Sequence, residues 1–217
     1  MRKFQFVFAT LVICTLGVQP AMAQRGRGGR GAPQDTSMSF FVTSSNPGGN
    51  GGNLGGLAGA DAHCQALAQV TGSTKTWRAY LSTSEPLVHA RERIGDGPWF
   101  NVSAQQVAAN VDDLHYSNQS FNKETGLTET GGIVNGVGDQ PNQHDILTGS
   151  NPDGTSSGAD CNNWTGGEGN ATVGHLDRMG RGAMAASWNA SHTSQGCTLE
   201  QLQASGGNGY FYCFAID

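Results

Sequence analysis

The chain has 217 residues, of which 33 are glycine, and its formal net charge is −5 at pH 7. Five of its 12 basic residues lie before residue 34 and all 17 acidic residues follow it, so residues 34–217 carry (12 − 5) − 17 = −10. A domain this acidic is a poor candidate for binding nucleic acid or an anionic polysaccharide such as heparin, because basic patches supply the affinity for such polyanions.

The first 23 residues have the three parts of a secretory signal peptide. Arg2 and Lys3 form a basic start, residues 4–18 are mostly apolar, and the small-residue motif "AMA" ends at Ala23. We expect cleavage after Ala23, and the alternative is an uncleaved N-terminal anchor. No later stretch approaches about 20 apolar residues, so we expect no transmembrane span after cleavage. The expected location is extracellular or in the cell envelope, either the periplasm or the outer surface.

Residues 24–38 have almost nothing to bury and predict a flexible Gly/Arg-rich linker, so that residues 39–217 form one domain. Cleavage at Ala23 removes Cys14 and leaves four cysteines. An even number in an exported chain predicts two disulfides, and three pairings are open. No CxxC pair points to redox or zinc chemistry. The four cysteines are Cys64, Cys161, Cys197 and Cys213.

In chain order, residues 39–45 ("SFFVTSS") predict an opening strand, and residues 58–72 predict a helix that stops at Gly72. Residues 76–83 ("TWRAYLST") alternate and predict a half-buried strand. The residues expected on the buried face of the helix are Ala60, Cys64, Leu67 and Ala68. The residues expected to point inward from the strand are Trp77, Ala79 and Leu81, against Arg78 and Tyr80 outward.

The second half of the domain reads as loop with few regular elements. Residues 103–114 predict a short helix capped by Ser103. Residues 116–172 are mostly loop around a short apolar stretch at 145–150, and residues 184–191 predict a strand and turn. Residues 209–217 ("GYFYCFAID") predict a final strand, which we expect beside the first because the termini of compact domains often meet.

Three ordered motifs resemble the endostatin family, and together they cover about residues 40–217. They are "GGLAGADAHCQALAQVTGSTKTWRAYLSTS", "ILTGSNPDGTSSGADCNNWT" and "SWNASHTSQGC…GYFYCFAID". Bacterial secreted endostatin-like proteins carry the same arrangement, whereas residues 85–144 match poorly. The resemblance implies an α+β, C-type-lectin-like fold, with two helices against a distorted antiparallel sheet and long loops. It also implies two nested disulfides, Cys64–Cys213 and Cys161–Cys197. The residues expected in the hydrophobic core are then Trp77, Trp164, Phe211 and Phe214.

Three departures from that family bear on ligands. Residues 24–60 contain no histidine, so the family's zinc site is absent, and the arginine-rich surface used for heparin is missing. A calcium-dependent lectin uses a Gln/Glu-Pro-Asn/Asp tripeptide and Trp-Asn-Asp. Here Gln140, Asn142 and Asn189 fit part of that pattern and offer the oxygen ligands that calcium prefers, but Ala190 replaces the Asp. We therefore expect no metal or other cofactor, and calcium bound by these three residues is the alternative.

Little in the sequence predicts an enzyme, and we expect no catalytic residues. "GTSSG" (154–158) matches G-x-S-x-G but lacks the strand and helix that a nucleophile elbow around Ser156 needs. The six histidines are scattered without a metal-binding spacing on one helix. His175 and His192 flank the segment between two of the cysteines, and no motif supports a metal site there.

The sequence thus predicts a secreted, non-enzymatic binding module. Its long loops, 85–145 and 165–195, would recognise an extracellular protein or a cell-surface glycan, because loops on a rigid scaffold carry recognition. The acidic surface favours basic or neutral ligands. The alternatives are a calcium-dependent carbohydrate-binding lectin and a structural protein of the envelope surface.

Overall fold

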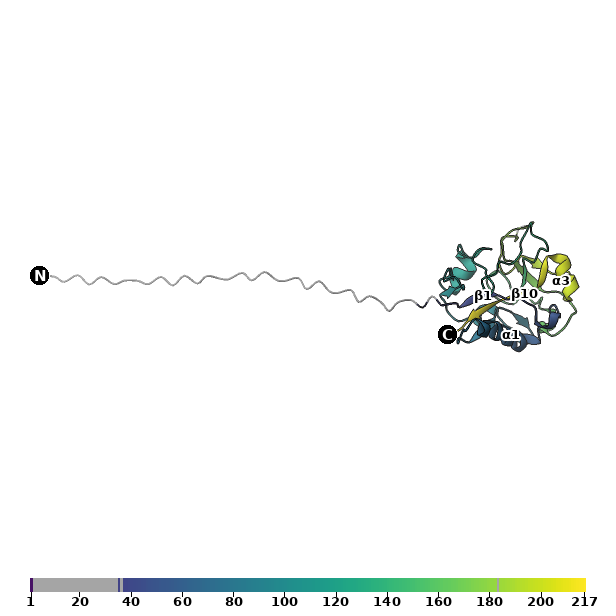
Figure 1. Ribbon diagram of the computed structural model, residues 1–217, viewed down its shortest axis with the longest axis horizontal. Helices are drawn as coiled ribbons and strands as arrows, with labels where there is room; N and C mark the ends of the chain where they lie inside the picture. Colours follow the sequence, from purple (N-terminus) through teal and green to yellow (C-terminus); the bar gives the residue numbers. More distant parts are fainter. Residues whose placement is uncertain (2–34, 36, 183) are drawn as a thin grey trace. The chain divides into compact units, whose positions relative to one another are not determined.

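The computed structural model describes Met1, Asp35 and residues 37–182 and 184–217. The predicted signal peptide, 1–23, and the predicted linker, 24–38, lie almost entirely outside these residues. Residues 35–217 form an α+β body of short helices, short strands and long loops (Figure 1). Within the described residues, no helix has the length and apolar character needed to cross a membrane.

Ten strands and three α-helices are spaced along this body. The strands are β1 (Phe40–Val42), β2 (Trp77–Ala79), β3 (Thr83–Ser84), β4 (Leu87–Val88), β5 (Trp99–Phe100), β6 (Gln106–Ala108), β7 (Asp145–Leu147), β8 (Thr172–His175), β9 (His192–Thr193) and β10 (Gly207–Ala215). The helices are α1 (Gly56–Val70), α2 (Cys161–Trp164) and α3 (Leu199–Ser205). Short 3-10 turns at Pro47–Gly49 and Ala90–Glu92 and a π-helical turn at Asp113–Ser117 complete them.

The main sheet has the order β1-β10-β7-β8-β9, and β2 also pairs with β10. The first strand lies antiparallel to the last, as predicted, with Phe40 opposite Phe214. However, β10 runs parallel to β7, with Phe211 opposite Leu147, so the expected antiparallel sheet is in fact mixed. The chain between β7 and β10 is long enough to include β8, β9 and α3, and a crossover of that kind permits parallel pairing.

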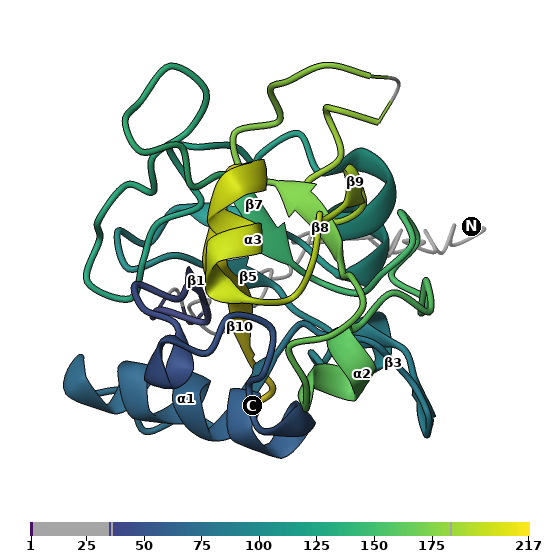
Figure 2. The same cartoon turned by 90° about the vertical axis from the view of Figure 1, so that its right-hand side faces the viewer.

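The predicted helix at 58–72 is present as α1, which packs against β2. A second helix, α3, packs against β10 and lies in front of β7 and β8 in Figure 2. It was not predicted, although its N-terminus has a recognisable capping box. Thr198 accepts from the backbone of Gln201, and the Gln201 side chain accepts from the backbone of Thr198.

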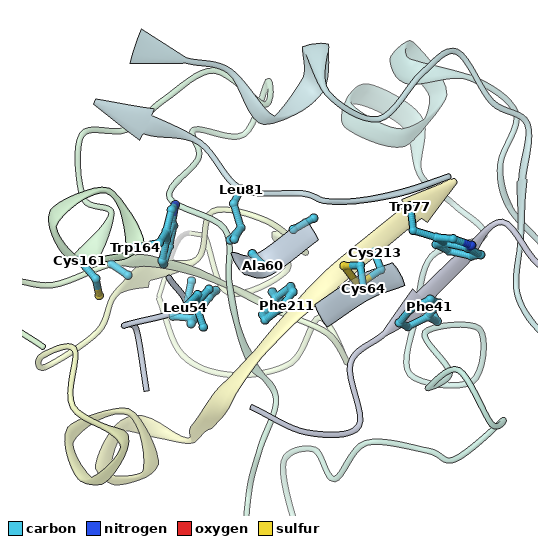
Figure 3. Close-up of a cluster of buried hydrophobic side chains, with 14 of the residues drawn as sticks. Phe41, Leu54, Ala60, Cys64, Trp77, Leu81, Cys161, Trp164, Phe211 and Cys213 are labelled. Carbon is cyan, nitrogen blue, oxygen red and sulfur yellow. A yellow bond between two sulfur atoms is a disulfide. The ribbon is translucent and has the colours of Figure 1, made fainter. Parts of the chain in front are cut away.

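A first hydrophobic cluster lies between α1 and the sheet, and both disulfides are part of it (Figure 3). The disulfides join Cys64 to Cys213 and Cys161 to Cys197, the pairs that the resemblance implies. On α1, Ala60, Cys64 and Ala68 are buried, while Leu67 is only half-buried. The other expected core residues are all 2% exposed or less; they are Trp77, Trp164, Phe211 and Phe214.

A second hydrophobic cluster fills the opposite face of the sheet and overturns the expectation for Tyr80. The alternation at 76–83 predicted an outward Tyr80, but its side chain is fully buried. Loop residues such as Leu114 and Phe121 cover this face, so both faces of the central sheet are buried. Strands covered on both sides do not show the simple inward–outward alternation of a half-buried strand.

The predicted helix at 103–114 is wrong for residues 103–110, and only residues 111–114 are helical, where they lead into the π-helical turn. Val107 and Ala108 lie in β6, which forms an antiparallel pair with β5. The turn between the two strands is held by Asn101, whose side-chain oxygen accepts from the backbone N–H groups of Ser103 and Gln105. Such local side-chain bonding competes with helix formation, so Ser103 is a turn residue and caps no helix. Residues 184–191 likewise form turns without the predicted strand.

Candidate functional site

Three loops on one side of the fold enclose a hollow of about 320 Å³. They are the π-helical turn after β6, the loop around Pro152, and the loop between β8 and β9. The first loop lies within 85–145 and the third within 165–195, the two segments expected to form the ligand surface, whereas Pro152 lies outside both. Ligand binding by these loops stays a prediction. The hollow is lined by His115, Tyr116, Ser117, Asn118, Gln119, Pro152, Arg178, Met184, Ala186, Ser187, Trp188 and Asn189.

Two of the lining residues have strained backbone conformations and hold each other in place. Asn118 has a φ of 28° and Arg178 a φ of 56°, values in the left-handed region that L residues seldom adopt. The Arg178 guanidinium donates from Nη1 to the Asn118 carbonyl at 2.8 Å and from Nε to the Ala186 carbonyl at 3.0 Å. Strain of this kind persists only where the surroundings enforce it, and it concentrates at functional sites.

A buried polar network lies beneath the hollow. The His115 Nδ1 lies 2.7 Å from the Val111 carbonyl, so it carries the proton, and Nε2 accepts from the Tyr80 hydroxyl at 2.8 Å. The Tyr80 oxygen in turn accepts from the Asn189 side-chain amide at 3.0 Å. Burial lowers the pKa of His115 and raises the pKa of Tyr80. Both rings are therefore neutral at pH 7, and the network fixes the floor of the hollow.

Tyr116 gives the hollow its exposed aromatic surface, while the Trp188 ring packs in the second hydrophobic cluster. Trp188 is 1% exposed, and its buried indole Nε1 has no hydrogen-bond partner among the described residues. Leaving such a donor unpaired costs about 1–3 kcal/mol, and its burial keeps it from a ligand in the hollow. Tyr116 is 66% exposed at the rim, and Arg91 lies 6.0 Å from its ring centroid and donates to its hydroxyl at 3.2 Å.

A second set of polar side chains lies at the edge of the sheet, where the pairing of β7, β8 and β9 brings four residues together. Asp145 lies opposite His175 in the β7–β8 pair, and His144 immediately precedes Asp145. His192 lies opposite Val173, two residues from His175 and therefore on the same face of the sheet. We call these four residues, His144, Asp145, His175 and His192, the His/Asp cluster.

The three imidazoles of the His/Asp cluster converge on one carboxylate oxygen. Asp145 Oδ1 lies 3.3 Å from His144 Nε2, 3.3 Å from His175 Nε2 and 3.4 Å from His192 Nε2. The rings of His144 and His175 stack with centroids 4.1 Å apart. His144, Asp145 and His175 are buried, and each offers a ligand atom within 4.8 Å of the other two. The residues of this group could hold a metal ion.

Each imidazole of the cluster is oriented by a bond at its other nitrogen. His144 Nδ1 donates to Asp177 at 2.8 Å, His175 Nδ1 to the Ala185 carbonyl at 2.9 Å, and His192 Nδ1 to the Thr193 carbonyl at 3.0 Å. Burial favours a raised pKa for Asp177, but hydrogen bonds from His144 and from two backbone N–H groups lower it to about 2. Asp177 is therefore a carboxylate at neutral pH.

The charges within the cluster favour an ionised Asp145. Burial alone would raise the pKa of Asp145, but the neighbouring His175 and His192 outweigh it, so the pKa lies below its usual value. The same carboxylate raises the pKa of His192, against a smaller opposing effect of burial. The cluster therefore places a carboxylate beneath three nitrogen ligands at the end of β7.

The residues suggested for calcium are not gathered in one hollow. Gln140 is exposed, and Asn142 lines a separate shallow hollow with Gln203 and Asn208. Asn189 lines the hollow of the three loops, where its side-chain oxygen accepts from Ser187 and its amide donates to Tyr80. Calcium binding by these residues stays an untested prediction.

Ser156 lies at an isolated β-bridge between turns and does not have the strand-to-helix setting of a nucleophile elbow. Sequence reasoning named His175 and His192 but did not assemble the His/Asp cluster, because its members come from three strands. The one local signal is the pair His144-Asp145 at the start of the short apolar stretch predicted at 145–150.

Fold and site together define a disulfide-linked α+β domain with a loop-built hollow and a buried His/Asp cluster. The chain belongs to the family described as "Protein of unknown function (DUF1554)", whose sequence model matches residues 47–181. The matched range includes His144, Asp145 and His175 and ends before His192. No curated protein matches the chain.

Proposed function

We propose that the protein is a secreted, non-enzymatic binding module built on a C-type-lectin-like, endostatin-like scaffold. The nested disulfides and the pairing of the first strand with the last support this scaffold. The three ordered motifs that resemble endostatin support it as well. The scaffold supplies a rigid sheet, and the long loops supply the recognition surface.

The observation that carries the proposal is the hollow between the three loops. Its volume of about 320 Å³ lies at the lower end of the range for small-ligand sites, about 300–1,000 Å³. It combines an exposed aromatic ring, Tyr116, with the exposed amide of Gln119 and the exposed hydroxyl of Ser117. An aromatic face beside amide and hydroxyl groups suits a neutral, hydroxyl-rich ligand, so we propose a sugar residue of a cell-surface glycan.

The lining of the hollow supports binding without catalysis. Both nitrogens of His115 are engaged in hydrogen bonds, which leaves this imidazole no free base for proton transfer. The Arg178 guanidinium is bonded to backbone carbonyls of the surrounding loops. The hydroxyl of Ser187 donates to Asn189 and has no imidazole beside it among the hydrogen bonds of the described residues. These groups hold the loops in position.

The proposal is tested by screening the oxidised, secreted chain on a glycan array and against collagen, laminin and fibronectin. Tyr116→Ala should weaken binding about 30-fold, since truncating an anchoring aromatic residue removes about 2 kcal/mol of binding free energy. Gln119→Ala should weaken it less. Leu87→Ala, which also truncates an exposed side chain but outside the hollow, should leave binding unchanged.

Each outcome of this screen favours one of the candidate functions. Glycan binding that is lost with Tyr116→Ala supports the proposal, and binding to a matrix protein that is lost in the same way moves it to a protein ligand. Glycan binding that requires calcium and survives Tyr116→Ala favours the calcium-dependent lectin. No binding to any probe contradicts the proposal and leaves the structural envelope protein.

A further inference from the structure

We propose that the His/Asp cluster is a zinc site, in which His144, Asp145 and His175 bind one Zn²⁺ ion and His192 lies beside it at the exposed edge. The three ligand atoms are Asp145 Oδ1 and the Nε2 atoms of His144 and His175. The site does not rest on the proposed binding function, although the loop between β8 and β9, which supplies Ala185 to His175, also lines the hollow.

The distances from Asp145 match those of a tetrahedral site. Zinc bonds to imidazole nitrogen and carboxylate oxygen are about 2.0–2.1 Å long, so ligand atoms at the corners of a tetrahedron lie about 3.3–3.4 Å apart. Asp145 Oδ1 lies 3.3 Å from the Nε2 atoms of both His144 and His175, and a ligand atom of each of the three residues lies within 4.8 Å of the other two. The oxygen thus stands from both nitrogens at the spacing that a single central ion would impose.

Hydrogen bonding within the cluster does not explain this arrangement. Among the described residues, neither carboxylate oxygen of Asp145 has a hydrogen-bond partner, and neither has His175 Nε2. The imidazole nitrogens nearest the carboxylate are the Nε2 atoms, while the Nδ1 atoms of His144 and His175 donate to other acceptors. A carboxyl group buried without such partners is costly, and a metal ion bound by His144, Asp145 and His175 compensates that burial.

The bonds at the outer nitrogens are those expected around a metal centre. All three Nδ1 atoms donate to an oxygen acceptor: Asp177, the Ala185 carbonyl and the Thr193 carbonyl. Donation from Nδ1 fixes the tautomer whose Nε2 lone pair is free to bind a metal. The carboxylate of Asp177 also makes the His144 imidazole a stronger ligand, as in other carboxylate–histidine–zinc arrangements.

The ligand set selects the metal and its role. Two imidazoles and one carboxylate suit zinc, whereas calcium prefers a shell of six to eight oxygens. Three protein ligands leave the fourth position of a tetrahedral shell open. The side chains of the three ligands are 6% exposed or less and that of His192 is 39% exposed, so the ion enters from the side of β9.

The site would connect segments that are otherwise held by few bonds. Asp177, bonded to His144, also accepts from the backbone N–H groups of Val137 and Met179. His175 is bonded to Ala185. A zinc ion on His144 and His175 therefore fixes the loop that precedes β7 and the loop that follows β8.

The test is a zinc titration of the untagged, oxidised chain after treatment with a chelator, followed by isothermal titration calorimetry. We expect one Zn²⁺ per chain. Co²⁺ bound in its place should give the intense visible absorption of a tetrahedral ion, a readout that a chance surface site would not give. Asp145→Asn and His175→Gln should each weaken zinc binding by at least about 10-fold, the lower end of what removing even an outer-shell partner costs.

His63→Gln is the matched control, because His63 lies on α1, bonds only to Ser45 among the described residues, and is not part of the cluster. His175→Gln and His144→Gln keep the proposal testable if Asp145→Asn fails to fold, since each removes one nitrogen ligand and keeps the carboxylate. The proposal is overturned if the wild-type chain binds no zinc with both disulfides intact. It is also overturned if either of these folded variants binds zinc as tightly as His63→Gln.

Discussion

Asp145 and His175 lie opposite each other in the β7–β8 pair, with Asp145 Oδ1 3.3 Å from His175 Nε2 and no hydrogen bond between them. Both residues are buried, Asp145 at the start of β7 and His175 at the end of β8, two strands that lie side by side in Figure 2. Polar side chains in such a position destabilise a fold unless something compensates their burial. The zinc proposal gives that compensation, and it makes the loops beside β7 and β8 depend on the metal.

Asp177→Asn tests the outer shell of the proposed site. The amide is similar in size, but it removes the charge that supports His144 and weakens the bonds to Val137 and Met179. We expect zinc affinity to fall about 10–100-fold with one zinc still bound per chain. Calorimetry measures both values. Asp96→Asn, at an exposed position, is the control, and equal affinities in the two variants would contradict a positioning role for Asp177.

The two disulfides should contribute unequally to stability. Cys64–Cys213 spans 149 positions and Cys161–Cys197 spans 36. In the chain-entropy model, the longer loop corresponds to about 5 kcal/mol and the shorter to about 4 kcal/mol. Replacing each pair by alanine should lower the urea midpoint, more for Cys64 and Cys213. A larger loss for Cys161 and Cys197 would show that loop length does not determine their contribution.

Gly174 in β8 lies against the loop that forms the floor of the hollow. A Cβ atom at this position would be 1.8 Å from the Trp188 carbonyl oxygen and 2.4 Å from the Asn189 amide nitrogen. Gly174→Ala therefore displaces backbone, and we expect a cost of about 3 kcal/mol or more. Gly167→Ala is the control, because its Cβ would meet only a Thr198 methyl group at 3.7 Å. Urea unfolding compares the two, and similar midpoints would contradict the close approach.

His115 should make the fold less stable in acid. Burial is the main cause of its lowered pKa, and Arg91 acts in the same direction, whereas the Val111 carbonyl, Asp153 and Asp112 oppose it. The unfolded state therefore binds the proton more readily. Stability from this group is present above the ordinary pKa of 6.5 and is lost as the pH falls below it.

The measurement for His115 is the difference in urea midpoint between pH 7.5 and pH 5, compared in wild type and His115→Gln. The comparison removes the contributions of other titrating groups, including His192, whose raised pKa acts in the opposite direction. We expect a smaller loss on acidification in the variant. An equal or larger loss would mean that His115 is not held neutral by its burial.

The elements predicted correctly from the sequence are those whose apolar residues recur at a regular helical or strand spacing. The helix around Cys64 and the strands at Phe40 and Phe211 were recognised because burial on one face leaves a regular pattern. The helix predicted at 103–114 failed because Val107 and Ala108 fit a strand as well as a helix. The Asn101 side chain, together with pairing to Trp99 and Phe100, decides the outcome.

The candidate sites were harder to predict from the sequence than the secondary structure was. The His/Asp cluster depends on the register of β7, β8 and β9, which places His175 and His192 on one face although they belong to different strands. No fixed spacing encodes such a pairing. The hollow was anticipated only as a region of long loops. Its strained residues, Asn118 and Arg178, carry no signature in a single sequence.

The most direct test of the metal centre is a melting curve of the untagged chain recorded with Zn²⁺, with Ca²⁺ and with a chelator. A ligand that binds only the folded state at a hundredfold excess over its Kd stabilises it by about 2.7 kcal/mol, which is about 5–10 °C for a domain of this size. We expect that upshift with zinc and none with calcium. Identical curves with zinc and with chelator would contradict the zinc site, and an upshift with calcium alone would favour the lectin alternative.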